Sequence, residues 1–592
     1  MPNPAGAAPV PLPHEVPRKP PGTREFSLRA VLVAMLVAAV IGGSYPYIVM
    51  KLGFGPNISV VSAFFGFLAL GLFFKDYNRW ENNIVQTAGT SAGQTAFLCV
   101  LMAAFDLLAQ DPATNFHLHL RPMQSFVWLT ISGLLGVLLA VPMRQHFIVD
   151  EKLTFADGVA AAETLIVLDS RGGEGRATAR SMGLGTLASA AIMTLRADAR
   201  VLADVWYRIP EMFAFGRLGQ IMNMGVSWSL LSIGSGMLVG MRINSSMIAG
   251  TIVSWTIAPP LLLQHGMIDE LVRRKVLLWV MWPATGMLVS GGLTALFLRW
   301  KILVRTFQQL SKDSVRSDEF PIRWVIAGSL ALTVALVIFQ RVSLGMPVWM
   351  TLVATAFSLV LMLVSLRVLG ETNWGPISAM SNMMQAIFGV LAPGQILPNM
   401  TASGITGSIA AQSEGLMQDY KTGYLIGSTP RFLTYAQLLA VPVGAAAVSC
   451  VYPLLRDTYG IGGEHGLTSP ISQKWAGFAK LLSGGLAALP PGAVQALVIG
   501  TLLGIVFTLL EGTRFKKWTP SPTGVGIGML VPGSAIVTMF LGGLAAEVWK
   551  KLARRNAETH LTPIASGFIA GEAIIAVLIP VLVVLKVLRL QP

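Results

Sequence analysis

The sequence predicts an all-α polytopic integral membrane protein, and three observations support this fold class. The chain has 592 residues, of which 53% are hydrophobic and only 12% are charged, against about 25% charged in ordinary soluble domains. Apolar runs of about 20 residues recur along the chain, and each is long enough to cross a hydrocarbon core of ~30 Å as a helix. The runs are continuously apolar and do not alternate with polar residues, which argues against the strands of a membrane barrel.

The apolar runs predict about 16 transmembrane helices. They lie near 28–49, 57–74, 84–108, 124–142, 182–195, 221–241, 245–264, 276–298, 322–341, 347–369, 376–393, 402–418, 430–453, 491–510, 523–546 and 564–588. The segments 376–393, 402–418 and 523–546 are short or interrupted by Gly and Pro, so each is expected either to cross the membrane or to be re-entrant. A further amphipathic piece is expected at 474–488.

Short motifs that recur in the same order indicate an internal duplication. FSLRAVLVA, which begins at Phe26, is similar to FPIRWVIAG, which begins at Phe320; WENN, with Glu81, is similar to GETN, with Glu371. MIAGT and FIAGE follow later in the two halves. The predicted organisation is a disordered Pro-rich cytoplasmic tail (1–25), a first transmembrane repeat (26–298), a basic cytoplasmic loop (299–321) and a second transmembrane repeat (322–592). Duplicated bundles are the usual architecture of secondary transporters, with the substrate site between the repeats.

The net charge of +14 comes from basic residues in the loops between apolar runs. This is the positive-inside pattern of membrane proteins, so no nucleic-acid partner is expected. The basic residues around the start of the first run predict a cytoplasmic N-terminus in a plasma (inner) membrane. No His/Cys cluster has metal-ligand spacing, and both cysteines lie in apolar runs, so neither a metal nor another cofactor is predicted. The sequence does not predict an oligomeric state.

Polar side chains gather inside the third apolar run, in ENNIVQTAGTSAGQT. The set at steps of three and four residues comprises Asn83, Gln86, Thr87, Thr90, Ser91 and Gln94, so these residues share one helical face. Such a face is costly to expose to lipid. Two interpretations stay open: hydrogen bonding to a neighbouring helix, or contact with substrate.

The second half has a matching polar and interrupted region between Asn373 and Leu416. It contains Gln385, Asn399 and Gln412, with breaks at Gly375-Pro376, Pro393-Gly394 and Pro398. Interrupted helices free backbone polar groups, which are tolerated at membrane depth only beside protein or water. Two such regions at matched places predict a substrate-binding site between the halves.

Three acidic residues lie among small or apolar neighbours: Glu163, Glu414 and Glu572. Burial disfavours the charged form of a carboxyl group, so each is a candidate to take up and release a coupling proton near neutral pH. The alternative is a carboxylate at a helix end in the membrane interface.

The stretch LMQDYKTGYLIGSTPRFLTYAQ, from Leu416 to Gln437, resembles a block of the oligopeptide transporter (OPT) family, roughly D-x-K-T-G-[YH] followed by S-P-R and a Gln. A second block, VPMRQHFIVDEKLTFADGVAAAETL, resembles another family pattern but has Ala156 where the family usually has Pro. ENNIVQTAGTSAG resembles a third. The resemblance covers residues 25–590 and is closer to the yellow-stripe-like branch and its bacterial relatives, since the Asn-Pro-Gly block of the eukaryotic peptide-transporting branch is absent.

The resemblance implies a secondary active transporter that couples uptake of oligopeptides or peptide-like compounds to protons by alternating access. Lys421 and Arg431 can hold substrate carboxylates through charge-assisted hydrogen bonds, or they can belong to a structural basic loop. Gly423 is expected to turn the chain at the end of one helix, and Pro430 to begin the next. Arg144, Glu151 and Lys152 are expected either in a cytoplasmic ion-pair network or at a substrate site.

Other functions remain as alternatives. The nearest is a transporter of metal–siderophore or other metal–chelate compounds with the same fold. A channel would need a simple repeated pore segment, which the duplicated design argues against. An intramembrane enzyme would need a His/Asp, Ser/Lys or HExxH constellation at membrane depth, and the chain contains none of these. It also lacks a GxxxxGK[ST] loop, which argues against ATP hydrolysis.

Overall fold

The computed structural model describes residues 19–52, 58–74, 76–114, 116–169, 176–195, 212–298, 318–461, 467, 469–483 and 489–584. The helices of the first half are α1 (Leu28–Leu52), α2 (Ile58–Phe73), α3 (Arg79–Phe97), α4 (Cys99–Gln110), α5 (Pro122–Ala140), α6 (Ala156–Asp169), α7 (Arg176–Leu195), α8 (Gly216–Met222), α9 (Leu230–Val239), α10 (Met241–Ile252), α11 (Ala258–Gln264) and α12 (Arg273–Leu298), with π-helices η2 (Gln145–Asp150) and η4 (Val253–Ile257) and a 3₁₀ turn η1 (Pro112–Thr114).

The second half begins with α14 (Ile322–Leu344). It continues with α15 (Val348–Thr372), α16 (Ile377–Leu391), α17 (Ile396–Ile426), α18 (Pro430–Tyr459), α19 (Pro470–Ser483), α20 (Ala493–Glu511), the 3₁₀ turn η6 (Arg514–Lys517), α21 (Pro522–Leu530), α22 (Gly533–Leu552) and α23 (Arg554–Val584). The described residues contain one small antiparallel sheet, in which β1 (Met212–Ala214) pairs with β2 (Gly225–Ser227).

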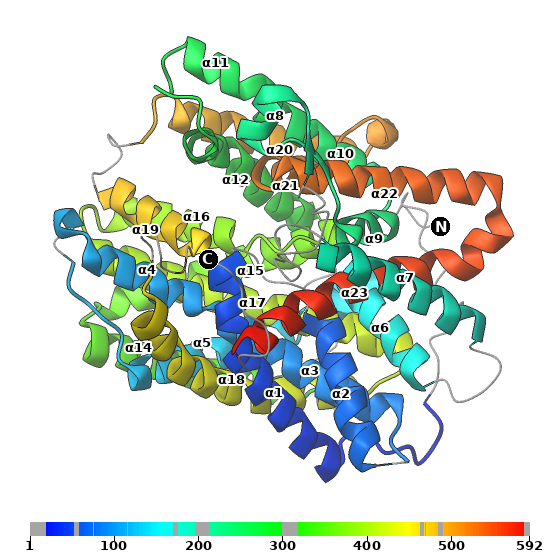
Figure 1. The fold of residues 1–592 in the computed structure, drawn as a ribbon. Helices are drawn as coiled ribbons and strands as arrows, with labels where there is room; N and C mark the ends of the chain where they lie inside the picture. Colours follow the sequence, from blue (N-terminus) through cyan, green and yellow to red (C-terminus); the bar gives the residue numbers. More distant parts are fainter. Residues whose placement is uncertain are drawn as a thin grey trace.

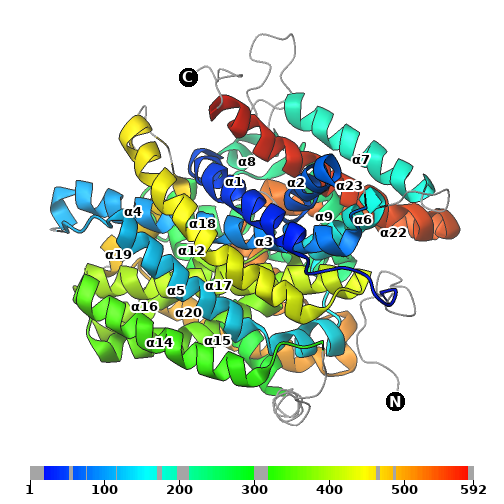
Figure 2. The same cartoon turned by 90° about the horizontal axis from the view of Figure 1, so that it is seen from below.

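The fold is the predicted all-helical polytopic membrane protein. Within the described residues, nine helical segments are long and apolar enough to cross a membrane: Leu28–Tyr47, Arg79–Gln110, Pro122–Ala140, Met241–Gln264, Arg273–Leu298, Ile322–Leu344, Val348–Thr372, Pro430–Tyr459 and Ala493–Glu511. Three shorter apolar helices lie at Ile58–Gly71, Leu230–Val239 and Ile377–Leu391. Helices of the two halves interleave: α3 packs between α1, α17 and α18, α7 packs along α23, and α12 along α20 (Figures 1 and 2).

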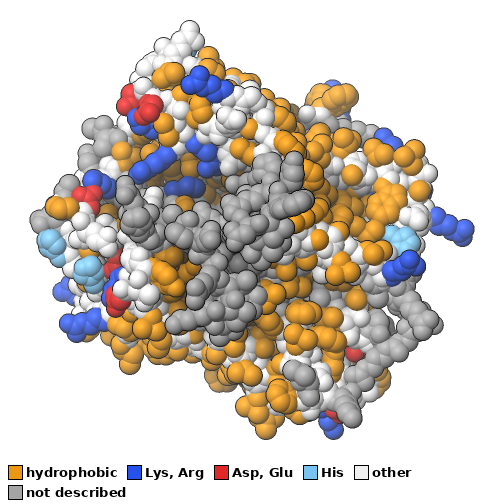
Figure 3. Space-filling model, viewed as in Figure 1, with side chains coloured by type: hydrophobic (Ala, Val, Ile, Leu, Met, Phe, Trp, Pro, Cys, Tyr) orange, Lys and Arg blue, Asp and Glu red, His pale blue; other side chains and the backbone are white. Residues whose placement is uncertain are grey.

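The surface carries large exposed apolar side chains, as expected for a protein solvated by lipid. On α14, Leu330, Val334, Ile338 and Val342 recur every four residues and are each more than half exposed. They therefore form a stripe along one face of a helix whose opposite face packs on α5 and α15. Figure 3 shows apolar side chains over much of the visible surface.

Helix α17 lies at the centre of the bundle and differs from the prediction. It is 31 residues long and buried without a break from Pro398 to Gly423, so the prediction of a short segment at 402–418 was wrong. Its Gly, Ala, Ser and Thr residues allow close approach of α3, α5, α15 and α16. Pro398 lies in the first turn, where proline is tolerated because the N–H is not needed.

The expected turn at Gly423 is also wrong. The helix continues to Ile426, and Gly427, with φ of +78°, forms the left-handed C-cap, a conformation that favours glycine. A Cβ on Gly423 would lie 2.5 Å from Leu433 Cδ1, so this glycine serves the packing of α17 on α18. Pro430 begins α18, as predicted.

The interruption predicted within 523–546 is present, because α21 ends at Leu530 and α22 starts at Gly533, after Pro532. Residues 1–18 of the predicted tail and 299–317 of the predicted loop lie outside the described residues. Within residues 19–25, Glu25 is buried and accepts a hydrogen bond from the Thr429 backbone N–H at 2.7 Å. The chain before α1 is therefore held against the start of α18.

Candidate transport site

A layer of polar side chains joins α3, α17 and α18 in the buried centre of the bundle. Asn78 caps α3 by accepting from the N–H groups of Trp80 and Glu81, both at 3.0 Å, which satisfies two otherwise unpaired donors. The polar residues of α3 recur at steps of three and four, so they share one face of the helix, and this face is turned toward α17. Sixteen of its residues are buried, from Trp80 to Ala96.

Asp419 on α17 is the acidic residue at the centre of this layer. The amide of Gln86 on α3 donates to Asp419 Oδ1 at 2.6 Å, and the amide of Gln437 on α18 donates to Oδ2 at 2.6 Å. Asp419 is fully buried. Among the described residues, the side chains that hold the Asp419 carboxyl group are neutral, namely the amides of Gln86 and Gln437.

The amides around Asp419 leave acceptor oxygens unpaired. The NH₂ groups of Gln86 and Gln437 donate to Asp419, so the oxygens of these two amides point elsewhere. Asn83 likewise uses its NH₂ to donate to Ser428 Oγ at 2.7 Å. The side-chain oxygens of Asn83, Gln86 and Gln437 are buried, with no hydrogen-bond partner among the described residues. The layer therefore contains three buried acceptor oxygens that are unpaired among the described residues.

Two turns before Asp419, Gln412 on α17 joins the same layer. Its NH₂ donates to Thr95 Oγ1 at 2.6 Å and to the Ser91 carbonyl at 3.0 Å, and Ser91 Oγ donates to Gln412 Oε1 at 3.1 Å. Gln94 faces α17 at Gly415, where its Cγ would lie 3.0 Å from an added Cβ. Gln94 remains partly accessible.

Gln385 and Asn399 do not join this layer. Gln385 on α16 donates to the Trp475 carbonyl of α19 at 3.2 Å, and Asn399 on α17 donates to the Gln385 carbonyl at 2.7 Å. Both side-chain oxygens are buried without a partner in the described structure. These two residues therefore form a second polar cluster, near the start of α17.

The three acidic residues singled out from the sequence lie apart. Glu414 on α17 is buried on the face opposite the amide layer; it accepts from Ser365 Oγ of α15 and packs over Gly375. Glu163 is partly buried on α6, which is not among the membrane-length helices, and burial raises the pKa of its carboxyl group to about 7. Glu572 accepts from Ser229 Oγ at 3.1 Å and from the Leu231 N–H at 3.0 Å, at the start of α9, so it serves as a helix cap.

The two cations of the stretch from Leu416 to Gln437, Lys421 and Arg431, lie in different surroundings. Lys421 is 2% exposed and donates to the Leu153 carbonyl at 2.7 Å, while Thr422 donates to the Gly158 carbonyl at 2.9 Å. The stretch is thus packed against the second sequence block, at 141–165. Arg431 lies at the start of α18, over the Phe432 ring, and its Nε is buried without a partner in the described structure.

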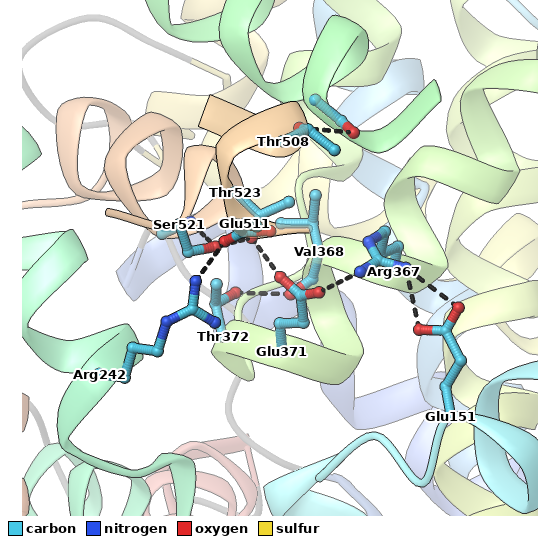
Figure 4. A network of polar contacts seen from close by, with 12 residues as sticks. Glu151, Arg242, Arg367, Val368, Glu371, Thr372, Thr508, Glu511, Ser521 and Thr523 are labelled. Carbon is cyan, nitrogen blue, oxygen red and sulfur yellow. Dashed lines mark hydrogen bonds and ion pairs between the residues drawn. The ribbon is translucent and has the colours of Figure 1, made fainter. Parts of the chain in front are cut away.

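An ion-pair network joins residues of both halves (Figure 4). Arg367 on α15 pairs with Glu151 at 2.9 Å and with Glu371 at 2.8 Å. Glu371 also accepts from Thr523 of α21, and Arg242 of α10 pairs with Glu511 of α20 at 2.5 Å. Glu151 therefore belongs to an ion-pair network, which was one of the two interpretations of this residue; the other was a substrate site. Arg144 instead pairs with Glu319 at 2.5 Å, and Lys152 forms no ion pair with this network in the described part of the chain.

Sequence reasoning missed the central residue of the polar layer, Asp419, and the central residue of the ion-pair network, Arg367. Asp419 and Gln437 were noted only as parts of a motif, although an acid inside a membrane-length apolar region is itself a signal. Arg367 was not singled out. Its i,i+4 spacing to Glu371 was visible in the sequence, but its contact with Glu151, 216 residues away, was not.

Comparisons with known proteins identify the family. The profile described as "OPT oligopeptide transporter protein" matches residues 25–583. The chain belongs to this oligopeptide transporter family. Similar proteins include the putative oligopeptide transporter YGL114W of Saccharomyces cerevisiae, 24% identical over 95% of this chain and 97% of that protein. The iron-phytosiderophore transporter yellow stripe 1 of Zea mays is 22% identical (93% and 89% covered), and the metal-nicotianamine transporter YSL2 of Arabidopsis thaliana is 23% identical (94% and 93%).

Proposed function

We propose that this OPT-family transporter imports oligopeptides or peptide-like compounds across the plasma (inner) membrane, coupled to protons, by alternating access. The basic residues around the start of α1 favour a cytoplasmic N-terminus. The buried acceptor oxygens of Asn83, Gln86 and Gln437 are the observation that supports this substrate class. Unpaired buried acceptors favour a substrate that brings N–H donors, which peptide backbones and amino groups supply.

The layer would bind substrate at Asn83, Gln86, Ser91, Gln94 and Gln412, where α3 of the first half meets α17 of the second. Gln385 and Asn399 would line a neighbouring polar cluster. Lys421 and Arg431 would support the site from its edge; the hydrogen bond from Lys421 to the Leu153 carbonyl favours a positioning role over direct contact. This arrangement agrees with a substrate site between two homologous repeats, 26–298 and 322–592.

Glu414 is the strongest of the three candidates for the coupling proton. It is buried, its described partner is a neutral hydroxyl, and it lies on the same helix as Asp419. A carboxyl group in such surroundings is easily neutralised. Glu163 is the second candidate because it is partly buried, and Glu572 the third, because its hydrogen bonds to the start of α9 favour a structural role.

Uptake into proteoliposomes tests this function. A labelled small-peptide library is supplied with and without an inward acid gradient, for the wild type and for Glu414→Gln. We expect gradient-driven accumulation of peptide by the wild type. The variant should lose accumulation but retain exchange of labelled for unlabelled substrate, because exchange requires no net proton movement. Accumulation that survives in Glu414→Gln moves the coupling site to Glu163 or Glu572.

A metal–chelate substrate is the second candidate, and the yellow-stripe-like relatives favour it. No group of three or more His, Cys, Asp or Glu side chains able to hold a metal occurs among the described residues, so a metal would travel inside its chelator. The same proteoliposomes distinguish the candidates. Uptake that requires both metal and chelator, with no uptake of any peptide, would overturn the peptide assignment.

A further inference from the structure

Three basic side chains meet where α12 begins. Arg273 and Arg274 open α12, and Lys474 lies near the start of α19. Arg274 Nη2 would lie 3.2 Å from a Cβ on Gly477 of α19, so its guanidinium reaches the neighbouring helix. Arg273 is close enough to Lys474 for the two charges to repel each other. We call these three residues the basic cluster.

Among the described residues, no carboxylate compensates the basic cluster. None of its three members forms an ion pair within the described residues, whereas the nearby acids Asp269 and Glu270 both pair with Lys275, at 2.9 and 3.2 Å. Arg273 instead stacks over the Trp255 ring at 4.8 Å, and its Nε is buried without a hydrogen-bond partner. Three uncompensated cations in one place repel each other, and a bound anion would relieve that repulsion.

Solvent can reach the basic cluster. Lys474 and Arg274 are exposed and Arg273 is partly buried, so an anion from solution can approach all three side chains. Desolvation, followed by repulsion from Arg273, lowers the pKa of Lys474 to about 8. Figure 3 shows basic side chains gathered in the hollow between the parts of the molecule that carry α11 and α19 in Figure 1.

The basic cluster lies at the end of the bundle opposite Glu25. Helix α18 starts beside Glu25 and runs to the other end, where Tyr452 donates to Asp106 of α4. Lys480 of α19 pairs with Asp111, just after α4, at 2.5 Å, so α19 and the basic cluster belong to that second end. With a cytoplasmic N-terminus, this is the side from which an imported substrate arrives.

We propose that Arg273, Arg274 and Lys474 form an anion-binding site that captures the carboxylates of the substrate before transport. The proposal rests on the proposed function and narrows it to substrates that carry at least one free carboxylate. Guanidinium groups bind carboxylate and phosphate in the same bidentate way, so a lipid phosphate shares this chemistry and has to be distinguished by experiment.

The test compares one peptide as the free acid and as its C-terminal amide, in proteoliposomes of phosphatidylcholine alone. The variant is Arg274→Gln/Lys474→Gln, which leaves the more buried Arg273 in place. The matched control is Arg341→Gln, an exposed cation near the end of α14, a helix that packs on α5 and α15. We expect KM for the acid to rise about tenfold in the double variant, with KM for the amide and both KM values of Arg341→Gln unchanged.

Equal KM values for the acid in the wild type and the double variant would overturn the proposal and leave the proposed function intact. A second readout does not depend on transport: citrate, as a carboxylate probe, should raise the Tm of the detergent-purified wild type but not of the double variant. Citrate that raises both equally also overturns the proposal. Stabilisation of the wild type by phosphatidylglycerol but not by citrate, lost in the double variant, would assign the site to lipid and overturn substrate capture. Citrate stabilisation without any uptake by the wild type would support the anion site and refute the proposed function instead.

Discussion

Gln86 Nε2 lies 2.6 Å from Asp419 Oδ1, which joins α3 to α17 across 333 residues of the chain. The other oxygen of the same carboxyl group accepts from Gln437 of α18. Three helices from both halves are therefore fixed to one acid by two neutral amides. Because amides can rotate, this arrangement can accept a neutral replacement of the acid, and the first prediction follows from that.

Asp419→Asn should fold, whereas Asp419→Ala should be destabilised. Asn can donate to the unpaired oxygen of one glutamine while it accepts from the other. Ala leaves two buried donors unpaired, at about 1–3 kcal/mol each. Thermal unfolding in detergent checks this, with a clearly lower Tm for Asp419→Ala than for Asp419→Asn. Equal Tm values for the two variants would show that these hydrogen bonds do not hold the helices.

Arg367 should be essential for stability because it separates two acids. Arg367→Gln leaves Glu151 and Glu371 without their shared cation, and breaking a buried pair in this way costs about 3–5 kcal/mol. Adding Glu371→Gln to the same chain should recover part of the loss, since one buried charge is removed. As a control, Lys550→Gln breaks a partly exposed pair with Glu547 and should cost at most about 1 kcal/mol. No recovery in the double variant would argue against charge as the cause.

Gly136→Ala should weaken the packing of α5 on α17. An added Cβ would lie 2.8 Å from both Cα and the carbonyl oxygen of Ile409, and backbone atoms cannot move aside as a side chain can. Gly183→Ala is the matched control, since no atom lies within 4 Å of its Cβ and alanine favours a helix over glycine by about 1 kcal/mol. We expect a lower Tm for Gly136→Ala and an equal or higher Tm for Gly183→Ala. The reverse order would contradict the close approach of α5 and α17.

The pH dependence of stability should reveal Glu163. Burial raises the pKa of this carboxyl group to about 7, from an ordinary value of 4.5. The wild type therefore loses stability as pH rises from about 4.5 to about 7, where the unfolded chain is ionised and the folded chain is not. Glu163→Gln removes that loss, so its Tm advantage should grow over this window and stay constant above it. Glu558→Gln, on an exposed pair with Arg554, should show no such window.

The fold class, the family and the polar face of α3 could be predicted because each depends on local pattern. Run length and composition identify membrane helices, and steps of three and four residues place Asn83 and Gln86 on one face. The length of α17 could not be predicted in this way: its polar residues and Lys421 reduce its hydropathy, yet partners elsewhere in the chain, on α18 and in the segment before α6, satisfy them. Gly423 shows the same difficulty, since a glycine used for helix packing and a glycine used for a turn look alike in sequence.

The grouping of side chains at the candidate site could not be predicted from the sequence, for a related reason. Glu414 and Asp419 are five residues apart on one helix, so they face different neighbours, Ser365 on one side and Gln86 on the other. Neither neighbour is close in sequence. Glu572 looked like an isolated acid, and only the position of α9 shows that it caps a helix.

The most direct test of the account is the KM for uptake of the best peptide substrate by two variants, Gln86→Leu and Gln385→Leu. Both replace a buried amide that has an unpaired oxygen, but only Gln86 lies in the layer between α3, α17 and α18. We predict that KM rises about tenfold or more in Gln86→Leu and stays near the wild-type value in Gln385→Leu. An unchanged KM in Gln86→Leu, or an equal rise in both variants, would contradict the assignment of this layer as the substrate site.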